Sequence, residues 1–259
     1  MSFFKRIALA AAVTVIAVGG AAAQEPAKIR IGTEGAYPPF NFLDASGELK
    51  GFDVDIAKAL CTAMQAECEF VVQDWDGMIP ALQAGKFDAI IASMSITEER
   101  LKQVDFTSKY YNTPPAIAVP KDSTLAGVTP EELGSLQLGA QSSTTHSNYA
   151  EEKFPDAALK LYPTAEEYKL DLASGRIDAA IDDVVVLSEW LATEEGACCK
   201  ILGTLTPDPA INGPGAGIAI RQGETELKAK FDAAIEAIRA DGTYKTINDA
   251  YFQFDVYGG

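Results

Sequence analysis

The chain has 259 residues, 47% of them hydrophobic, and a formal net charge of −16. This length exceeds that of one average domain and allows two domains or lobes. So acidic a composition argues against a nucleic-acid-binding role, because phosphates are bound by clustered lysine and arginine.

The first 23 residues have the three parts of a secretory signal peptide. Lys5 and Arg6 form a charged region, an apolar stretch follows, and three alanines precede Gln24 as a cleavage site. The apolar stretch is shorter than the roughly 20 residues of a membrane-spanning helix, which disfavours an anchor. We therefore expect residues 1–23 to be removed and the mature chain to be exported. Its formal net charge then changes from −16 to −18, because Lys5 and Arg6 are lost.

The four cysteines fit an exported chain. Cys61 and Cys68 flank the end of an expected helix and the start of the next strand. In an oxidising compartment this spacing predicts a local disulfide, and the alternative is two buried thiols. Cys198 and Cys199 are adjacent, and a ring between neighbours is strained, so the sequence leaves their redox state open. His146 is the only histidine and there is no CxxC motif, so we expect no zinc site and no cofactor.

In the first half of the chain, expected strands end in polar and aromatic residues. The first strand leads into a loop made rigid by two prolines, and this loop carries Glu34 and Tyr37. A helix is expected after Gly51, capped by Asp53, as part of the scaffold. A later strand is followed by Trp75, which either stacks on a ligand or covers the core.

The most informative segment is a hydroxyl-rich turn before an arginine. Ser93, Met94 and Ser95 follow a short apolar strand, and Thr97 is expected to cap a helix that contains Arg100. Open α/β sheets place ligand sites at such strand ends, and the arginine fork suits a carboxylate. The alternative is a capped surface helix with a solvated arginine.

The second half repeats this pattern. A second hydroxyl-rich turn with Thr145 and His146 begins a helix, whose N–H groups either bind an anion or are only capped. A later strand ends in Asp182 and Asp183. One of these carboxylates can cap the following helix while the other faces a ligand or cation.

The order of elements predicts an α/β protein with two lobes and a ligand cleft between them. We expect lobe 1 to comprise residues 28–112 and 216–259, and lobe 2 to comprise residues 113–215. The chain would cross between the lobes twice, near 111–116 and near 212–217. Both crossings contain proline or glycine in otherwise extended sequence.

These motifs resemble the periplasmic solute-binding proteins of polar amino-acid ABC importers, above all the lysine/arginine/ornithine- and histidine-binding group. The resemblance covers residues 28–259. It rests on Arg100, on the Cys61/Cys68 pair, and on the segments 51–57, 93–97, 176–180 and 240–244. It implies the two-lobed type II fold, closure on the ligand by hinge motion, and a periplasmic location. It also implies a monomer that delivers an L-amino acid to a membrane permease.

The resemblance further implies how the amino-acid head group is held. Arg100 would pair with the α-carboxylate, helped by the backbone N–H groups of Ser95 and Thr145. The α-ammonium would meet Asp183, the Ser95 hydroxyl and the Ser93 carbonyl. A zwitterion needs such a fixed cation and fixed anion, so the chemistry agrees with the implied roles.

The ligand side chain would be held by the remaining implied residues. Tyr37 and Trp75 would enclose it and Glu34 would meet its far end, which suits a long cationic side chain. Met94 and His146 complete the expected set of ligand-binding residues.

Three positions bear on which ligand is bound. Glu34 stands where several relatives have aspartate, His146 where glutamine is frequent, and Ala92 where basic-amino-acid binders often have serine and opine binders alanine. We expect arginine first, then ornithine or lysine, then histidine, with an octopine-like opine as an alternative. Another alternative is an enzyme similar to cyclohexadienyl dehydratases, with Glu34, Asp182 or His146 as general acid. A third is a periplasmic receptor that binds the same ligand for a sensory partner.

Overall fold

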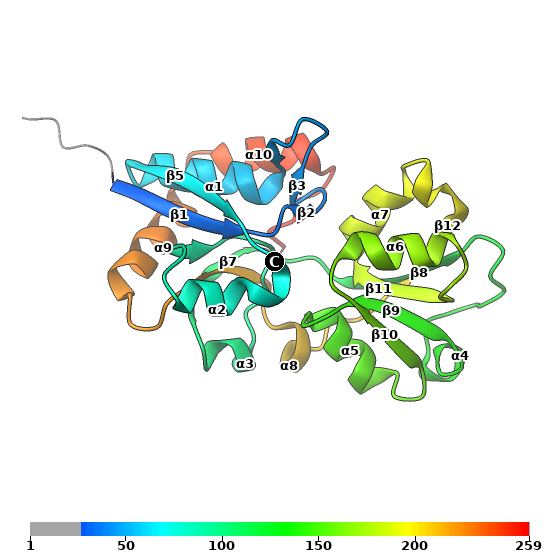
Figure 1. The fold of residues 1–259 in the computed structure, drawn as a ribbon. Coiled ribbons are helices and arrows are strands. Elements are labelled where there is room, and N and C mark those ends of the chain that lie inside the picture. Colours follow the sequence, from blue (N-terminus) through cyan, green and yellow to red (C-terminus); the bar gives the residue numbers. More distant parts are fainter. Residues whose placement is uncertain (1–26, 259) are drawn as a thin grey trace, which may run out of the picture.

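The computed structural model describes residues 27–258, so the expected signal peptide at 1–23 lies outside the described residues. The chain forms two lobes, each built around a five-stranded sheet with helices on both faces (Figure 1). The α/β, two-lobed architecture expected from the sequence is confirmed. Within residues 27–258, no helix combines the length and apolar character needed to cross a membrane.

Lobe 1 is built around the strands β1 (Ala27–Thr33), β5 (Ala66–Val72), β6 (Ala89–Ile90), β7 (Asp105–Tyr111) and β13 (Ala216–Ile220). They lie in the order β5-β1-β6-β13-β7. β1 is parallel to β5 and β6, whereas β13 is antiparallel to β6 and β7. β13 comes from the C-terminal part of the chain, so it ties the end of the sequence into the first sheet.

Helices cover both faces of this sheet, and a small hairpin sheet lies at its edge. The elements are α1 (Phe52–Ala63), α9 (Thr225–Ala240), α10 (Thr243–Tyr251), η1 (Trp75–Gly77), α2 (Met78–Gln83), α3 (Glu98–Leu101), β2 (Ala36–Tyr37), β3 (Asn41–Leu43) and β4 (Leu49–Lys50). Successive side chains of β13 alternate between the faces. Ile218 and Ile220 pack with α1 and α9, and Ala219 packs with α2.

Lobe 2 repeats the arrangement. Its strands are β8 (Pro115–Pro120), β9 (Gln137–Gln141), β10 (Ala158–Tyr162), β11 (Ala179–Asp183) and β12 (Cys199–Thr204), in the order β10-β9-β11-β8-β12. Its helices are α4 (Pro130–Leu133), α5 (Thr145–Lys153), α6 (Ala165–Ala173), α7 (Val184–Leu191) and the short η2 (Glu195–Cys198). Figure 1 shows α4 and α5 on one face of this sheet and α6 and α7 on the other.

Two segments connect the lobes. Residues 112–114 join β7 to β8, and residues 205–215 join β12 to β13 through α8 (Pro209–Asn212). The second segment turns at Gly213, where φ is +66° and a Cβ would lie 1.7 Å from the carbonyl oxygen of Ile96, so only glycine fits. The N–H of Ile96 donates to the carbonyl of Gly215 at 2.9 Å. The return crossing is therefore bonded directly to the segment that carries the expected site.

One helix start differs from the prediction. Asp53 does not cap α1; the N-cap is Gly51, with φ of 122° and no side-chain cap. A Cβ at Gly51 would lie 2.3 Å from the carbonyl oxygen of Phe40, so the chain turns into the helix at this glycine. Asp53 is instead buried in the first turn, where it accepts hydrogen bonds from Ser93 and Tyr110. Burial raises the pKa of Asp53 to about 6, against the effect of these hydrogen bonds.

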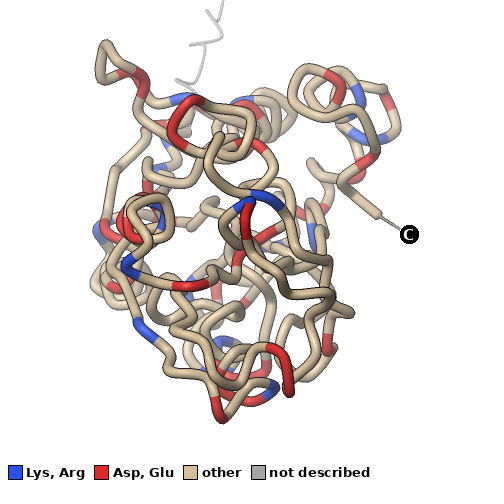
Figure 2. The backbone as a smooth tube through the Cα atoms, turned by 90° about the vertical axis from the view of Figure 1, so that its right-hand side faces the viewer, with Lys and Arg blue, Asp and Glu red and all other residues tan. Residues whose placement is uncertain are grey.

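The excess of acidic residues does not define a face. The chain has 37 acidic and 21 basic residues, and Figure 2 shows the acidic ones distributed around the whole molecule. A binding function must therefore be argued from individual buried charges and not from a surface patch.

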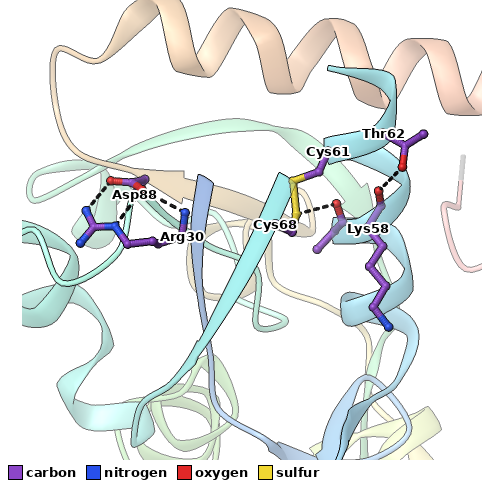
Figure 3. Close-up of a disulfide and its surroundings, with 7 residues drawn as sticks. Arg30, Lys58, Cys61, Thr62, Cys68 and Asp88 are labelled. Carbon is purple, nitrogen blue, oxygen red and sulfur yellow. Dashed lines mark hydrogen bonds and ion pairs between the residues drawn. A yellow bond between two sulfur atoms is a disulfide. The ribbon is translucent and has the colours of Figure 1, made fainter. Parts of the chain in front are cut away.

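The expected disulfide is present between Cys61 and Cys68, and it joins the end of α1 to β5 (Figure 3). The same figure shows Arg30 of β1 bonded to Asp88, with Nη2 2.7 Å from Oδ1, which ties the turn before β6 to the sheet. Cys198 is exposed and Cys199 is buried; both are free, with sulfurs 2.8 Å apart.

Candidate ligand-binding cleft

A cavity with about 320 Å³ of empty space lies between the lobes. Its lining includes eight of the residues expected from the sequence: Glu34, Tyr37, Trp75, Ser93, Ser95, Arg100, Thr145 and His146. The first six come from lobe 1 and the last two from lobe 2. Residues far apart in the sequence are thus brought to one place.

Asp183 lines an adjoining space of about 430 Å³, which shares Tyr37, Ser95 and Thr145 with the first. The two spaces are therefore parts of one cleft. Oδ1 of Asp183 accepts from the N–H of Val185 at 2.8 Å and so caps α7, and Oδ2 accepts from the hydroxyl of Thr113. Burial raises the pKa of Asp183 to about 7. This carboxylate both caps a helix and faces the cleft.

Arg100 is held by backbone carbonyls from both lobes. Thr97 caps α3 as expected, accepting from the N–H of Arg100 at 3.2 Å. The guanidinium Nη1 donates to the carbonyl of Ser95 at 2.9 Å, and Nη2 donates to that of Ser143 at 3.0 Å. Its carbon lies 5.3 Å from the centroid of the Trp75 ring.

The guanidinium of Arg100 has no carboxylate within 4 Å among residues 27–258. Burial lowers its pKa to about 10, so it remains charged at neutral pH. A desolvated charge without a counterion is unfavourable, and an anion in the cavity relieves that cost. The arrangement therefore suits a ligand carboxylate.

The start of α5 adds donors beside Arg100. The Thr144 hydroxyl accepts from the N–H of Ser147 at 3.1 Å, and the Ser147 hydroxyl accepts from the N–H of Thr144 at 3.2 Å. This capping box fixes the helix end, so that the first-turn N–H groups, starting at Thr145, lie at the cavity wall. The N-terminus of a helix favours an anion.

Two non-glycine residues with positive φ lie at the cleft: Ser93 lines it, and the carbonyl of Ser143 accepts from Arg100. Ser93 has φ of 56° and Ser143 has φ of 57°. The N–H of Ser93 donates to the hydroxyl of Tyr110 at 3.0 Å, and its hydroxyl donates to Asp53 at 2.9 Å. Such strained conformations persist where their surroundings hold them, often at functional sites. Asp53, read from the sequence as scaffold, thus supports the site.

The other end of the cavity is formed by Glu34 and Gln141. Glu34 is 7% exposed, and its Oε1 accepts from Nε2 of Gln141 at 2.6 Å. Gln141 also donates to the carbonyl of Pro163 at 3.0 Å. Burial raises the pKa of Glu34 to about 7, the hydrogen bond from Gln141 opposes this, and the charges of Asp182 and Asp74 add to it. Glu34 has no basic side chain within 4 Å in the described part of the chain.

Asp182 holds together several side chains at the cavity wall. It accepts from the hydroxyls of Tyr37, at 2.5 Å, and Tyr168, and its Oδ1 lies 3.1 Å from Nδ1 of His146. Burial lowers the pKa of His146, although the charge of Asp182 opposes this. Sequence reasoning did not place Asp182 or Gln141 among the ligand-binding residues. The only signal was their position at the ends of two expected strands.

Met94 is placed differently from the expectation. Its side chain is 2% exposed and packs with Met78, Leu82 and Val104 under α2. In an extended segment successive side chains point in opposite directions, so Ser93 and Ser95 face the cleft while Met94 faces the core. The side chain of Met94 therefore does not line the cavity, and a part for Met94 in ligand binding stays a prediction.

Direct contacts hold the lobes together across the cleft. The Ser142 hydroxyl donates to Asp76 at 3.0 Å, and Nε1 of Trp75 donates to the carbonyl of Ser143 at 3.3 Å. The bonds from Tyr37 to Asp182 and from Gln141 to Glu34 also join the lobes. The structure is therefore closed, with the charged groups of both lobes facing one cavity. No group of three or more histidine, cysteine or acidic side chains within residues 27–258 could hold a metal ion.

Residues 29–254 match the family model of the bacterial extracellular solute-binding proteins, family 3. The chain belongs to this family. An L-arginine-binding protein of Pseudomonas aeruginosa is 44% identical over 259 residues, covering 98% of this chain and 99% of that protein. The histidine-binding periplasmic protein of Salmonella typhimurium is 39% identical over 237 residues, covering 90% and 91%. The family resemblance expected from the sequence is thus confirmed.

The fold agrees with a solved structure of an ancestral arginine-binding protein bound to arginine. The TM-score is 0.81 at 38% identity, covering 88% of this chain and 100% of that one. The two-lobed fold is therefore that of an amino-acid-binding protein.

Proposed function

We propose that this protein captures a basic L-amino acid in the periplasm, arginine in preference to ornithine or lysine and then histidine, and delivers it to an ABC permease. One observation carries the proposal: the closed cleft holds a half-buried guanidinium, Arg100, and two buried carboxylates, Glu34 and Asp183, without ionic partners of their own among the described residues. An amino acid with a cationic side chain supplies one anion and two cations, which is the complement of this set.

The head group fits at the junction of the two spaces. Its carboxylate would lie between Arg100 and the first-turn N–H groups of α5, and its ammonium would face Asp183. Both ends are then fixed by charge-assisted hydrogen bonds, which are stronger than neutral ones. Because these partners come from both lobes, the head group favours the closed form.

The side chain extends toward Glu34, between the rings of Tyr37 and Trp75. Oε1 of Glu34 already accepts from Gln141, so its other oxygen remains for the ligand. Gln141 has both amide hydrogens engaged, with Glu34 and with Pro163, so its carbonyl oxygen is left as an acceptor. Two acceptors in a cavity that is also lined by Tyr37 and Trp75 suit a guanidinium.

The identities of the relatives support this ranking. A protein named for L-arginine binding is 44% identical over nearly the whole chain, and one named for histidine binding is 39% identical. Basic amino acids are thus the ligand class most consistent with both the sequence and the cavity.

The two alternatives fit the cavity less well. An octopine-like opine carries a second carboxylate and a larger head group, whereas the closed cavity is small and Glu34 and Asp183 are acidic. The small side chain of Ala92, which lines the cavity, is the feature that favours an opine. A dehydratase would use Glu34 as general acid, but Arg100 and Asp183 together match capture of a zwitterion better than elimination from a ring.

Competition dialysis tests the proposal. Ligand-stripped protein would be equilibrated with labelled L-arginine and challenged with L-ornithine, L-lysine, L-histidine, L-glutamine and octopine. We expect the basic amino acids to displace the label in that order and glutamine to displace it poorly. Displacement by octopine alone, or conversion of prephenate to an aromatic product, would contradict the proposal. The protein is expected to be monomeric throughout, and light scattering would check this.

A further inference from the structure

Asp182 is a buried carboxylate that the proposed function does not use. It is 2% exposed and does not line either part of the cleft. Its Oδ1 accepts from the hydroxyl of Tyr37, lies 3.1 Å from Nδ1 of His146, and accepts from the N–H of Asp183 at 2.7 Å. Its Oδ2 accepts from the hydroxyl of Tyr168. All of its partners except Tyr168 belong to the residues that line the cleft.

These partners come from different lobes. Tyr37 belongs to β2 of lobe 1, whereas His146, Tyr168 and Asp183 belong to α5, α6 and β11 of lobe 2. The bond from Tyr37 to Asp182 therefore crosses the cleft, and it exists only while the lobes are together. The other bonds of Asp182 lie within lobe 2 and persist when the lobes separate.

We propose that Asp182 is a positioning residue for the closed state: its carboxylate holds the Tyr37 ring of lobe 1 against His146 of lobe 2 when the cleft closes. This inference rests on the proposed function. Across the cleft, Asp182 acts through Tyr37, whose side chain lines both parts of the cleft. A bond from a hydroxyl to a carboxylate between buried side chains is stronger than a neutral hydrogen bond, so losing it weakens the closed state.

Two matched variants separate closure from folding. Tyr37→Phe removes the hydroxyl that crosses the cleft, and Tyr168→Phe removes a hydroxyl that meets the same carboxylate within lobe 2. Release of L-arginine would be measured by stopped-flow tryptophan fluorescence, and the melting temperature would be measured without ligand. We expect Tyr37→Phe to speed release about tenfold or more, with the melting temperature of the ligand-free protein unchanged. We expect Tyr168→Phe to lower that melting temperature and to change release by less than about twofold.

A double-variant cycle tests whether Tyr37 acts through Asp182. Asp182→Ala removes the acceptor and should speed release, and adding Tyr37→Phe to it should produce little further change, because the shared bond is already lost. Additive effects, or release that is no faster in Tyr37→Phe than in Tyr168→Phe, would overturn the inference while leaving the proposed function intact. If the unmodified protein binds no amino acid, the proposed function and this inference both fail.

Discussion

At the residue scale, the cleft separates charges that would normally pair. Arg100 bonds only to backbone carbonyls and the carboxylates of Glu34 and Asp183 bond only to neutral groups, so each charge is available to a ligand. Keeping these charges unpaired is unfavourable for the empty closed form. A ligand that supplies the missing charges therefore stabilises closure.

Replacing Arg100 should remove amino-acid binding. Arg100→Ala deletes the cation that meets the ligand carboxylate, and two lost charge-assisted hydrogen bonds weaken affinity at least about 100-fold. Calorimetry with L-arginine measures this. Arg176→Ala is a matched control, because Arg176 is exposed and pairs with Asp171 away from the cleft. Equal affinity of Arg100→Ala and Arg176→Ala would refute the role of Arg100.

Selectivity should depend on pH through Glu34. Without a cation beside it, burial in the closed cavity raises the pKa of Glu34 from 4.5 to about 7. Closure around neutral glutamine then takes up a proton, so glutamine affinity falls as pH rises toward 7. A guanidinium at Glu34 keeps the carboxylate charged, so arginine affinity stays flat. Asp183 faces the α-ammonium, which arginine and glutamine both carry. The effect of Asp183 titration on affinity is therefore the same for both ligands and cancels in the ratio of their affinities.

We therefore expect the arginine-to-glutamine affinity ratio to rise about tenfold or more between about pH 5 and 7. Titration calorimetry of both ligands across this range provides the ratio. Glu34→Gln carries no titrating group at this position and should show a lower ratio that does not change with pH. A ratio in the unmodified protein that is independent of pH would show that Glu34 does not contact the ligand side chain.

At the element scale, the start of α5 is both a structural cap and a wall of the site. Thr144→Ala removes the cap, which should lower the free energy of unfolding by about 1 kcal/mol and also weaken arginine binding. Thr129 caps α4 in the same way, accepting from the N–H of Glu132, but lies outside the cleft. Thr129→Ala should therefore lower stability without changing affinity. Urea unfolding measures the stability of both variants, and calorimetry measures their affinity for L-arginine. Equal arginine affinities of Thr144→Ala and Thr129→Ala would show that the start of α5 does not take part in ligand binding.

The disulfide links the end of α1 to β5 in lobe 1 (Figure 3). Replacing both Cys61 and Cys68 by serine opens a short loop and should lower the free energy of unfolding by about 2–3 kcal/mol. Arginine affinity should remain unchanged, because neither sulfur lines the cleft. Cys198→Ser, at an exposed free thiol, is the control and should leave stability nearly unchanged. A loss below about 1 kcal/mol in the double variant would show that the bridge contributes little.

The ends of elements show what the sequence could and could not predict. Thr97 capped its helix as expected, because a hydroxyl before two acidic residues is a local signal. The cap of α1 was misassigned because it depends on Gly51 passing close to Phe40, which is a tertiary contact. The short apolar strand expected before Ser93 is present in the structure, but it comprises only Ala89–Ile90.

The site could be predicted only in part, because some of its residues stand in local patterns and others depend on tertiary contacts. Glu34 and Arg100 stand in local patterns that the sequence displays. The parts played by Gln141, which lines the cavity, and Asp182, which supports it, were missed because they depend on partners more than 100 residues away in the other lobe, Glu34 and Tyr37. Contacts of that kind follow from how the lobes meet and not from spacing in the chain.

At the scale of the whole molecule, the chain crosses twice between the lobes (Figure 1). The cleft is lined by residues of both lobes. The return crossing is bonded to the segment of Ser95 and Arg100, through Ile96 and Gly215. The C-terminal segment also reaches the first crossing, since the N–H of Asn112 donates to the carbonyl of Val256 at 2.8 Å. Both crossings are therefore hydrogen-bonded to lobe 1, one of them next to the residues of the site.

The most direct test of the central claim is a calorimetric titration of the ligand-stripped mature protein with L-arginine. Our account predicts saturable binding with one ligand per chain, together with affinity for L-glutamine weaker by at least about tenfold at pH 7.5. Absence of binding by L-arginine, L-ornithine, L-lysine and L-histidine alike would contradict the account. Tight binding of L-glutamine with no preference for a cationic side chain would contradict it equally.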